Sequence, residues 1–449
     1  MEGTRLRSTM ARILTGRLSR ALVVENPHAS LDPLLLEGGF EEVVRLSQAP
    51  EAEELLAQLQ ANRTQVLFKR SRVPVTRQVI EGAVDLVAIQ LCCIGDDSID
   101  KQACADHGVL VFNDPISNGR SVVELVIGHL ISLSRGIHIS NSQTHQGDWQ
   151  KHNRGRFEVF GKRLGIVGLG NIGRGVAKVA QALGMEVRFH DNRRVAQEVG
   201  QEMGWKSADT LQTLFSECDM ITLHPSAVDF LGGSNAGMIT RELLMSLGAK
   251  RPENAPRIFL NLSRGFLHSP QDLVAAVQAK VIRAAAVDVY PEEPRSAGPG
   301  WSNPYAAHPE VVCTPHIGAA TQEAQPRIAQ RVAQTTLSFS RTGSVRDCVL
   351  APRTQVSMLD DLRPGRAVLV VTHGTTRGTK RALDQAIFEA GADNLRSEHH
   401  DLERWSMALD INLLDQPLPA SALGVIAKRT AELSGDADAV RSIRQVIQS

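Results

Sequence analysis

The sequence predicts an α/β protein whose parallel sheets are followed by a smaller α+β domain. Short apolar runs alternate with amphipathic helical patterns from residue 21 to about residue 340, which is typical of parallel sheets covered by helices. A glycine-rich turn at Gly168–Gly173 stands between one such run and a helical pattern. From residue 363 onward the predicted order is strand, helix, strand, strand, helix, strand, which is typical of a ferredoxin-like domain.

The glycine-rich turn has the residues of a dinucleotide-binding site in their required context. The apolar run Leu164–Val167 leads into the sequence GLGNIG, and Asp191 follows 18 residues after Gly173. Gly168 allows a tight turn, Gly170 lets the backbone approach a pyrophosphate, and Gly173 lets helix and strand pack closely. The helix that begins here offers unpaired N–H groups to the phosphates.

Asp191 predicts which dinucleotide is bound. A carboxylate at this position accepts hydrogen bonds from the ribose hydroxyls and repels a 2′-phosphate, which favours NAD over NADP. Arg193 and Arg194 follow closely, so NADP is the alternative cofactor, because arginine side chains bind a 2′-phosphate.

Composition argues against several classes of protein. The chain has 449 residues, of which 49 are basic and 49 acidic, so nothing in its zero formal charge indicates nucleic acid or a membrane as partner. No apolar run approaches the roughly 18 residues of a transmembrane helix. The cysteines lack CxxC spacing, which favours a reducing cytoplasm and predicts neither disulfides nor a metal site. They are Cys92, Cys93, Cys104, Cys218, Cys313 and Cys348.

The first 20 residues hold five arginines and one acid. This predicts a disordered basic tail, with an organelle transit peptide as the alternative.

Periodicity divides the chain into six segments. They are the tail (1–20), a flavodoxin-like α/β substrate domain (21–117 and 304–340), a Rossmann-type dinucleotide domain inserted in it (118–303), a linker (341–362) and the ferredoxin-like domain (363–449). We expect the active site in the cleft between the substrate and dinucleotide domains, where ligand pockets often lie.

The predicted elements follow the same periodicity. The expected strands are 21–25, 65–68, 86–91, 109–112, 164–167, 185–189, 220–223, 257–262, 283–289, 311–314, 367–372, 394–400, 405–413 and 443–447. The expected helices are 31–46, 51–60, 99–107, 121–135, 240–246, 270–278, 321–338, 379–390 and 420–433, together with the one that ends at Gly184.

Three polar residues lie just past predicted strands or in the loops that follow them. They are Arg264 in NLSRG, Glu293 in DVYPEEP and His316 in TPHIG. Because ligands of open α/β sheets bind beyond the carboxyl ends of the strands, we expect all three in reach of one cleft.

These motifs resemble the D-isomer-specific 2-hydroxyacid dehydrogenase family. The similarity extends from Ala21 to Ser449 and is closer to the branch that acts on phosphoglycerate and carries a C-terminal ACT domain. The motifs that carry it are FKRSRVPVTRQVI, LVAIQLCCIGDDSID, GVLVFNDPISNGRSVVELVIG, GDWQK, NLSRG, DVYPEEP and TPHIGAATQEAQ. The resemblance implies NAD-dependent oxidation of D-3-phosphoglycerate to 3-phosphohydroxypyruvate, the first step of phosphorylated L-serine biosynthesis. It also implies a homo-oligomer, a tetramer or a dimer.

The resemblance further implies roles for individual residues. His316 is the expected general base, Glu293 orients its ring, and Arg264 holds the substrate carboxylate and polarises the C2 oxygen. The expected substrate contacts are Arg70, Arg72, Ile94, Gly95, Asn118 and Lys151, the last from the same or a neighbouring subunit. The expected cofactor contacts are Gly168, Gly170, Asn171, Ile172, Gly173, Asp191, Leu262, Ser263, Asp288, Gly318 and Ala319, with Asp288 at the nicotinamide end.

Two other functions remain open at this point. One is a related reductase of hydroxypyruvate, glyoxylate or 2-oxoglutarate, which needs no phosphate contact at Arg70. The other is a non-enzymatic NAD(H)-sensing protein, whose known relatives carry a disordered tail in place of a C-terminal domain.

The C-terminal domain departs from the family pattern. The family has a His-x-Asn-x-Pro-Gly turn and a later Asn that bind serine between paired ACT domains, whereas this chain has His373–Gly378 and Asp393. Thr375 lacks the paired donor and acceptor of an amide, so we expect serine inhibition to be weak or absent. Glu398–Asp401 resembles a metal cluster, but neighbouring residues on a strand face opposite sides, which favours a surface strand.

Overall fold

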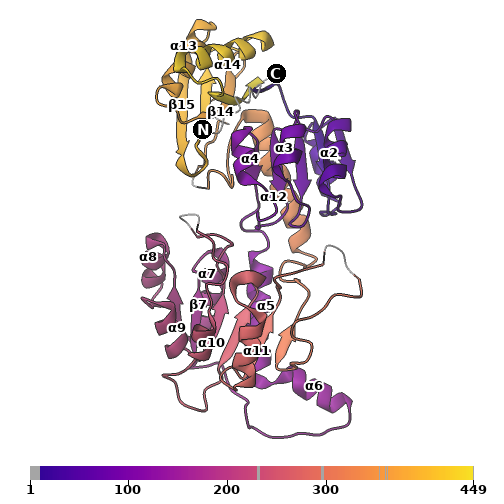
Figure 1. Ribbon diagram of the computed structural model, residues 1–449, viewed down its shortest axis with the longest axis vertical. Coiled ribbons are helices and arrows are strands. Elements are labelled where there is room, and N and C mark those ends of the chain that lie inside the picture. Colours follow the sequence, from indigo (N-terminus) through magenta and orange to yellow (C-terminus); the bar gives the residue numbers. More distant parts are fainter. Residues whose placement is uncertain are drawn as a thin grey trace, which may run out of the picture. The chain divides into compact units, whose positions relative to one another are not determined.

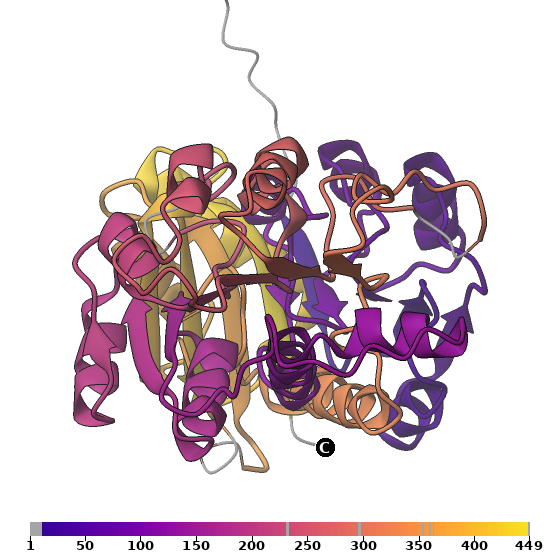
Figure 2. The ribbon, with the colours of Figure 1, turned by 90° about the horizontal axis from the view of Figure 1, so that it is seen from below.

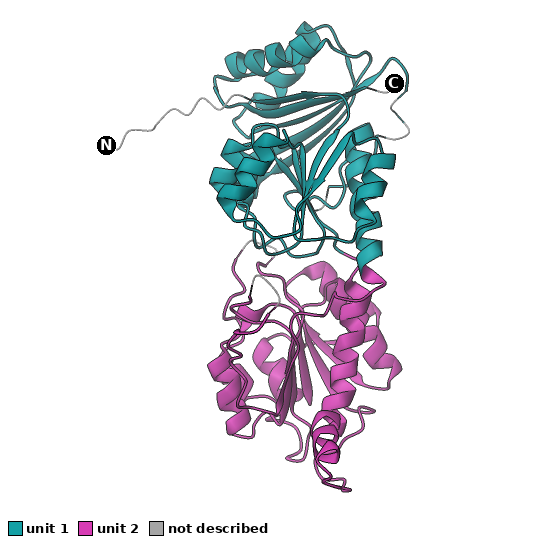
Figure 3. Cartoon of the chain, turned by 90° about the vertical axis from the view of Figure 1, so that its right-hand side faces the viewer, with its two compact units in different colours: residues 1–115, 325–449 teal, residues 116–324 magenta. Residues whose placement is uncertain are grey.

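The computed structural model describes residues 11–229, 233–294, 298–352, 354–358, 361 and 363–447. The chain forms two compact units (Figure 3). Unit 1 consists of residues 1–115 and 325–449, and unit 2 of residues 116–324. Unit 1 is therefore discontinuous in sequence, with unit 2 inserted in it.

The first sheet of unit 1 is parallel and has the strand order β3-β2-β4-β5-β6. This is the flavodoxin-like order predicted for the substrate domain. Its strands are β2 (Arg20–Val23), β3 (Glu42–Arg45), β4 (Val66–Lys69), β5 (Ala88–Leu91) and β6 (Leu110–Phe112). Its helices are α1 (Leu31–Glu37), α2 (Ala52–Ala61), α3 (Arg77–Gly82), α4 (Lys101–Asp106) and the returning α12 (Ala324–Thr342) (Figure 1).

β3 shows that the prediction of one helix over 31–46 is wrong. α1 ends at Glu37, and Gly39 then adopts a φ of +101° that ends the helix. The strand that follows pairs in parallel with β2, from Arg20↔Glu42 to Val23↔Arg45. Its two adjacent valines fit a strand better than a helix.

The C-terminal sheet of unit 1 has the order β1-β17-β14-β16-β15. Four of its strands pair antiparallel in the predicted βαββαβ sequence. The elements are β14 (Ala367–Gly374), α13 (Thr379–Glu389), β15 (Asn394–Leu402), the short 3-10 helix η2 (Glu403–Trp405), β16 (Met407–Leu414), α14 (Ala420–Ser434) and β17 (Val440–Ile447). The two long helices lie together on one side of this sheet (Figure 1).

The other face of the C-terminal sheet packs into the core of the first sheet. Val368, Val370 and Ile411 lie in one hydrophobic cluster with Leu22 and Phe68. The two sheets of unit 1 thus share one hydrophobic core.

β1 (Arg12–Thr15) corrects the prediction that residues 1–20 are a disordered tail. It extends the C-terminal sheet in parallel with β17, from Arg12↔Ser442 to Thr15↔Gln445. Arg12 Nη1 donates to the carbonyl oxygen of Leu86 at 2.9 Å, and burial lowers the pKa of Arg12 to about 10. The basic composition hid this strand, because a half-buried arginine that donates to main-chain oxygens cannot be told from a solvated one in the sequence. Residues 1–10 of the predicted tail lie outside the described residues.

Unit 2 contains a parallel sheet with the order β13-β12-β11-β10-β7-β8-β9. This is the predicted Rossmann order, extended by one strand. Its strands are β7 (Arg163–Val167), β8 (Glu186–His190), β9 (Lys206–Ser207), β10 (Met220–Leu223), β11 (Ile258–Asn261), β12 (Ala284–Val287) and β13 (Val311–Cys313). Its helices are α5 (Gly119–Arg135), α6 (Ile137–His145), α7 (Asn171–Ala182), α8 (Arg194–Glu202), α9 (Leu211–Glu217), α10 (Arg241–Met245), the 3-10 helix η1 (Gly265–Leu267) and α11 (Pro270–Gln278). Helices cover both faces of this sheet (Figure 2).

β13 corrects the boundary predicted for the second part of the substrate domain. Residues 304–340 were assigned there, but Val311–Cys313 pairs in parallel with β12 and belongs to unit 2. The chain returns to unit 1 only with α12. A strand of three residues carries no signal of which sheet it joins, so periodicity alone misplaced it.

Among the described residues, no single helix is both long and apolar enough to cross a membrane. Taken together, α5 and α6 have the length and apolar composition of a membrane-spanning segment, but the two helices are bent by 64°. α5 contributes Val126 and Leu130 to the core of unit 2.

Candidate active site

The turn between β7 and α7 is shaped as the sequence predicts. Gly168 has a φ of +86°, and a Cβ on Gly173 would lie 2.2 Å from the carbonyl oxygen of Gly168. Gly170 is the N-cap of α7 and has no side chain to cap the helix. The helix begins with Asn171 and Ile172, and the positive end of its dipole suits an anion.

Asp191 lies at the end of β8 and is held on several sides. Its carboxylate accepts from the Leu169 N–H at 2.8 Å and from the Arg193 N–H at 2.8 Å. The Arg193 guanidinium also donates two hydrogen bonds to this carboxylate, from Nε to Oδ1 at 3.0 Å and from Nη2 to Oδ2 at 2.8 Å. Burial acts to raise the pKa of Asp191, but these hydrogen bonds outweigh it and hold the pKa below its usual range. The carboxylate is thus charged, and its guanidinium partner is itself half-exposed.

Arg264 follows β11 in a tightly bonded turn. Asn261, the last residue of β11, donates through Nδ2 to the Arg264 carbonyl at 2.9 Å and accepts from the Ser263 N–H at 3.1 Å. A Cβ on Gly265 would lie 2.0 Å from the carbonyl carbon of Tyr290, so only glycine fits there. Leu262 is buried beneath this turn.

Glu293 and His316 form the predicted pair. His316 Nδ1 lies 2.7 Å from Glu293 Oε2, and the second carboxylate oxygen accepts from the Tyr290 N–H at 3.1 Å. Because a carboxylate only accepts, Nδ1 is the donor to Glu293, and in the neutral ring the lone pair is therefore on Nε2. The His316 side chain is 45% exposed, so this nitrogen is accessible.

Asp288 has a structural task that the sequence did not predict. Its carboxylate accepts from Thr314 Oγ1 at 2.6 Å, from the Ile317 N–H at 2.8 Å and from the Gly318 N–H at 2.8 Å. These residues flank His316, whose φ of +55° is unusual for a residue with a side chain. Burial raises the pKa of Asp288 despite these bonds. Asp288 therefore secures the loop that carries the histidine.

Asn118 and Lys151 differ in their surroundings. Asn118 precedes α5 and is buried, and its Oδ1 has no hydrogen-bond partner within the described part of the chain. A Cβ on its neighbour Gly119 would lie 3.0 Å from Asn171 Nδ2, so Asn118 is close to the glycine-rich turn. An unsatisfied buried acceptor next to an anion-binding helix indicates a ligand site. Lys151 is exposed, in the irregular stretch after α6.

The remaining predicted substrate residues belong to unit 1. Arg70 is half-buried and Arg72 exposed, in the loop that follows β4. Ile94 and Gly95 follow β5, and Asn113 donates to the Ile94 carbonyl at 2.9 Å. The main-chain N–H groups of Ile94 and Gly95 have no acceptor among the described residues, which leaves them available to a carboxylate.

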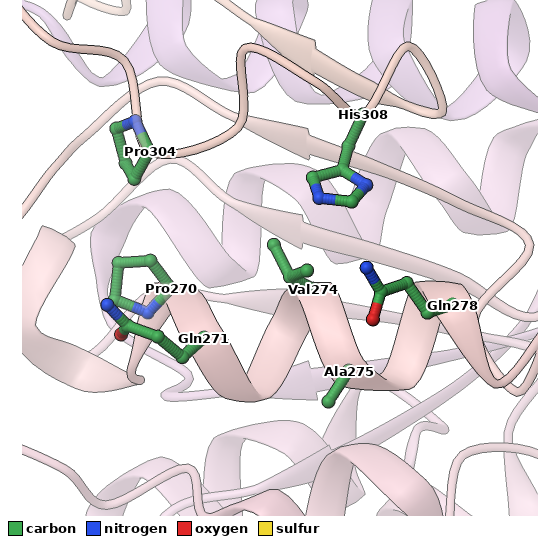
Figure 4. Close-up of a pocket in the computed structure, with 7 residues that line it drawn as sticks. All are labelled: Pro270, Gln271, Val274, Ala275, Gln278, Pro304 and His308. Atoms are coloured by element: carbon green, nitrogen blue, oxygen red, sulfur yellow. The ribbon is translucent and has the colours of Figure 1, made fainter.

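Two hollows in the described part of the structure lie apart from these residues. The first, of about 210 Å³, lies between α11 and the loop that carries Pro304 and His308 (Figure 4). It is lined by Pro270, Gln271, Val274, Ala275, Gln278, Pro304 and His308. The second, of about 390 Å³, is a polar crevice in unit 1 that includes Gly374–Thr376, the turn where serine binding was predicted to be lost. No predicted catalytic or cofactor residue lines either hollow.

One group of side chains in the described part has the composition of a metal site. His373 Nε2 lies 2.6 Å from Asp410 Oδ2, and His399 Nδ1 lies 3.1 Å from Asp410 Oδ1. The Lys380 ammonium is 3.6 Å from the same carboxylate and supplies positive charge there. We therefore assign hydrogen bonds and ion pairs to this group.

Known proteins share this arrangement of sequence and fold. A family profile described as "D-isomer specific 2-hydroxyacid dehydrogenase, NAD binding domain" matches residues 127–318. D-3-phosphoglycerate dehydrogenase of Escherichia coli (strain K12) is 33% identical over 379 residues, which are 83% of this chain and 86% of that protein. The chain belongs to the D-isomer-specific 2-hydroxyacid dehydrogenase family. D-3-phosphoglycerate dehydrogenase 2 of Saccharomyces cerevisiae (strain ATCC 204508 / S288c) is 30% identical over 403 residues, covering 88% of this chain and 82% of that one.

Solved structures agree on the fold of this dehydrogenase. The TT0316 protein from Thermus thermophilus has a TM-score of 0.59 at 27% identity, covering 71% of this chain and 96% of that one. A glyoxylate reductase from Paecilomyes thermophila has a TM-score of 0.63 at 21% identity, covering 74% and 98%. The second likeness supports the fold alone.

The residues of unit 2 fit the NAD that this dehydrogenase uses. The N-terminus of α7, where the N-cap is a glycine, suits a pyrophosphate, and the charged Asp191 suits ribose hydroxyls. The buried Oδ1 of Asn118 lacks a partner that a ligand would supply. The protein is therefore an NAD-dependent oxidoreductase, as predicted.

Proposed function

We propose that this dehydrogenase oxidises D-3-phosphoglycerate to 3-phosphohydroxypyruvate, the first step of phosphorylated L-serine biosynthesis. The His316–Glu293 pair carries the proposal, since a histidine held by a carboxylate is the group needed to remove the alcohol proton. The names of the Escherichia coli and Saccharomyces cerevisiae relatives support the choice of substrate.

In this proposal the protein moves one proton while a hydride leaves C2. His316 Nε2 accepts the proton of the C2 hydroxyl, and Glu293 stabilises the imidazolium that forms through the bond to Nδ1. NAD, when bound, supplies the nicotinamide that accepts the hydride. Such acid–base help typically contributes about 10²–10⁴-fold to the rate.

Several further residues are proposed to hold the substrate. Arg264 binds its carboxylate and polarises the C2 oxygen, which suits a planar guanidinium. The N–H groups of Ile94 and Gly95 meet the same carboxylate. Arg70 and Arg72 bind the phosphate. Asn118 and Lys151 remain proposed contacts.

The test is a hydride-transfer assay with 3-phosphoglycerate and NAD, and the reverse reaction with 3-phosphohydroxypyruvate. We expect turnover of both phosphorylated compounds, and loss of most turnover in a His316→Ala variant that still binds NAD. His308→Ala is the matched control, because His308 lines the hollow beside α11 and should not affect the rate. Turnover of glyoxylate, hydroxypyruvate or 2-oxoglutarate without turnover of either phosphorylated compound would reject the proposed substrate.

We also propose a cytoplasmic homo-oligomer, a tetramer or a dimer. The family resemblance supports the assembly. The six cysteines, all of them among the described residues, form no disulfide, which supports a reducing compartment. Sedimentation of the purified protein would measure the assembly directly.

A further inference from the structure

The loop after β4 starts beside the end of a neighbouring strand. β2 and β4 pair in parallel, and the Val24 N–H donates to the Phe68 carbonyl at 2.9 Å. Glu25 therefore follows β2 next to the point where the chain leaves β4. Its φ is +63°, a conformation that a residue with a side chain adopts rarely unless contacts hold it.

The Glu25 carboxylate fixes the main chain of this loop. Oε2 accepts from the Arg70 N–H at 2.8 Å, and Oε1 accepts from the Arg72 N–H at 2.6 Å. The Glu25 side chain is only 4% exposed, so the carboxylate itself is buried although Arg72 is exposed. One carboxylate thus binds the main chain of both arginines in the loop, Arg70 and Arg72.

Lys69 completes the arrangement from inside the protein. Its side chain is fully buried, and Nζ lies 3.6 Å from Glu25 Oε2. Nζ also donates to the Arg70 carbonyl at 2.7 Å and to Ser98 Oγ at 2.7 Å. Burial lowers the pKa of Lys69, and the neighbouring Glu25 acts to raise it. The ammonium therefore balances the buried carboxylate and holds the second main-chain group of Arg70.

We propose that Glu25, balanced by Lys69, is a positioning residue for recognition of the substrate phosphate. By fixing the main chain at Arg70 and Arg72, it presents their guanidinium groups in one arrangement and so favours phosphorylated over unphosphorylated 2-hydroxy acids. This inference rests on the proposed function. It concerns binding of the phosphate and not the hydride transfer itself.

A Glu25→Gln variant tests the proposal. The amide keeps the volume but has one acceptor oxygen for two N–H groups, and it leaves Lys69 without a counter-charge. We expect the KM for 3-phosphoglycerate to rise at least about tenfold while kcat stays within about twofold. The kcat/KM for unphosphorylated D-glycerate should not change. The amide hydrogens of Arg70 and Arg72 should also exchange faster with solvent than in the wild type.

Two further variants separate positioning from stability. Glu42→Gln is the matched control, because Glu42 forms an ion pair with Arg20 at 3.1 Å at the start of β3, whereas the loop follows the end of β4, and its KM values should match the wild type. Glu25→Gln combined with Lys69→Met removes the unbalanced charge, so it should fold even where the single variant does not. The double variant still lacks the second acceptor, and we expect its KM for 3-phosphoglycerate to stay high.

The outcomes distinguish this inference from the proposed function. Failure of the wild type to use 3-phosphoglycerate rejects the proposed substrate and this inference with it. Wild-type turnover together with normal KM values in both Glu25 variants rejects only this inference. Two other results would also overturn this inference, because each assigns Glu25 a purely structural role. One is a wild-type KM for 3-phosphoglycerate in the double variant. The other is an equal loss of kcat/KM with 3-phosphoglycerate and with D-glycerate.

Discussion

At the scale of single residues, the His316 loop depends on Asp288 more than the sequence indicates. Three donors converge on this carboxylate, and an amide offers them a single acceptor oxygen. Asp288→Asn should therefore lower kcat about 10- to 100-fold, equivalent to about 1.5–3 kcal/mol for a charge-assisted hydrogen bond. Thr314→Val, which removes one donor only, should have a smaller effect. A raised KM for NAD with normal kcat would instead assign Asp288 to the cofactor, as first predicted.

A buried histidine gives the stability a dependence on pH. His268 is 3% exposed, its Nδ1 lies 3.1 Å from the Ser269 carbonyl, and its Nε2 has no hydrogen-bond partner among the described residues. Burial lowers the pKa of His268 below its usual value of about 6.5. Below that pH the unfolded chain binds a proton that the folded protein does not, so stability falls as the pH falls.

The size of this effect is measurable by urea unfolding at pH 7 and pH 5. The histidine should contribute a loss of up to about 1.4 kcal/mol per pH unit until its folded-state pKa is reached. His268→Phe should reduce the loss, since phenylalanine does not titrate and keeps an aromatic ring beside Phe259. His145→Gln, on the exposed helix α6, should leave the pH dependence unchanged. If the free energy of unfolding depended equally on pH in the wild type and in both variants, the role assigned to His268 would be wrong.

At the scale of elements, Arg444 joins β17 to the end of α12. Its guanidinium is buried and donates to the Phe339 carbonyl at 2.9 Å and to that of Ser340 at 2.5 Å. These oxygens belong to the last turn of α12. The Phe339 carbonyl also accepts from the Gly343 N–H at 3.0 Å, whereas the Ser340 carbonyl accepts from no main-chain N–H among the described residues. Burial lowers the pKa of Arg444 to about 9, so it stays charged at neutral pH.

Arg444→Met should therefore destabilise unit 1. The Ser340 carbonyl would be left unsatisfied, which costs about 1–3 kcal/mol, so we expect a loss of roughly that size and a lower unfolding temperature for that unit. Arg429→Met is the comparison, because Arg429 pairs with Glu389 on the surface of α14 and should contribute under about 1 kcal/mol. Equal stability of the two variants would show that the Arg444 contacts are unimportant.

The elements also show what the sequence could and could not predict. Elements with clear apolar periodicity were placed within one or two residues, such as the strand Met220–Leu223 and the helix Pro270–Gln278. The short strands β1, β3 and β13 were missed or misassigned, because three or four residues have too little periodicity to show which sheet they join. Motif residues such as His316 were found because their chemistry requires them.

Partners that are distant in the sequence were not predictable. Glu25 precedes Arg70 by 45 residues, and a lone glutamate after a strand usually lies in solvent. Asp288 was found as a motif residue, but its three donors depend on the backbone of the 314–318 loop. Such contacts follow from the register of neighbouring strands, which periodicity does not specify.

At the scale of the whole molecule, the described hydrophobic clusters divide cleanly between the units. One cluster combines the first sheet, α12 and the inner face of the C-terminal sheet, and a second lies between the C-terminal sheet and its helices. The other two lie within 122–311. None of these clusters includes residues of both units. The C-terminal domain should therefore unfold together with the first sheet, and unit 2 should unfold separately.

Calorimetry with and without NAD tests this division. The residues proposed to hold NAD all lie in unit 2, so only its transition should move. At 100 times the dissociation constant, binding adds about 2.7 kcal/mol, which for a domain of this size raises the unfolding temperature by about 5–10 °C. An Asp191→Ala variant should show a smaller shift at the same NAD concentration, because it loses the carboxylate proposed for the ribose. A single transition that moves as a whole with NAD would contradict the separate unfolding of the two units.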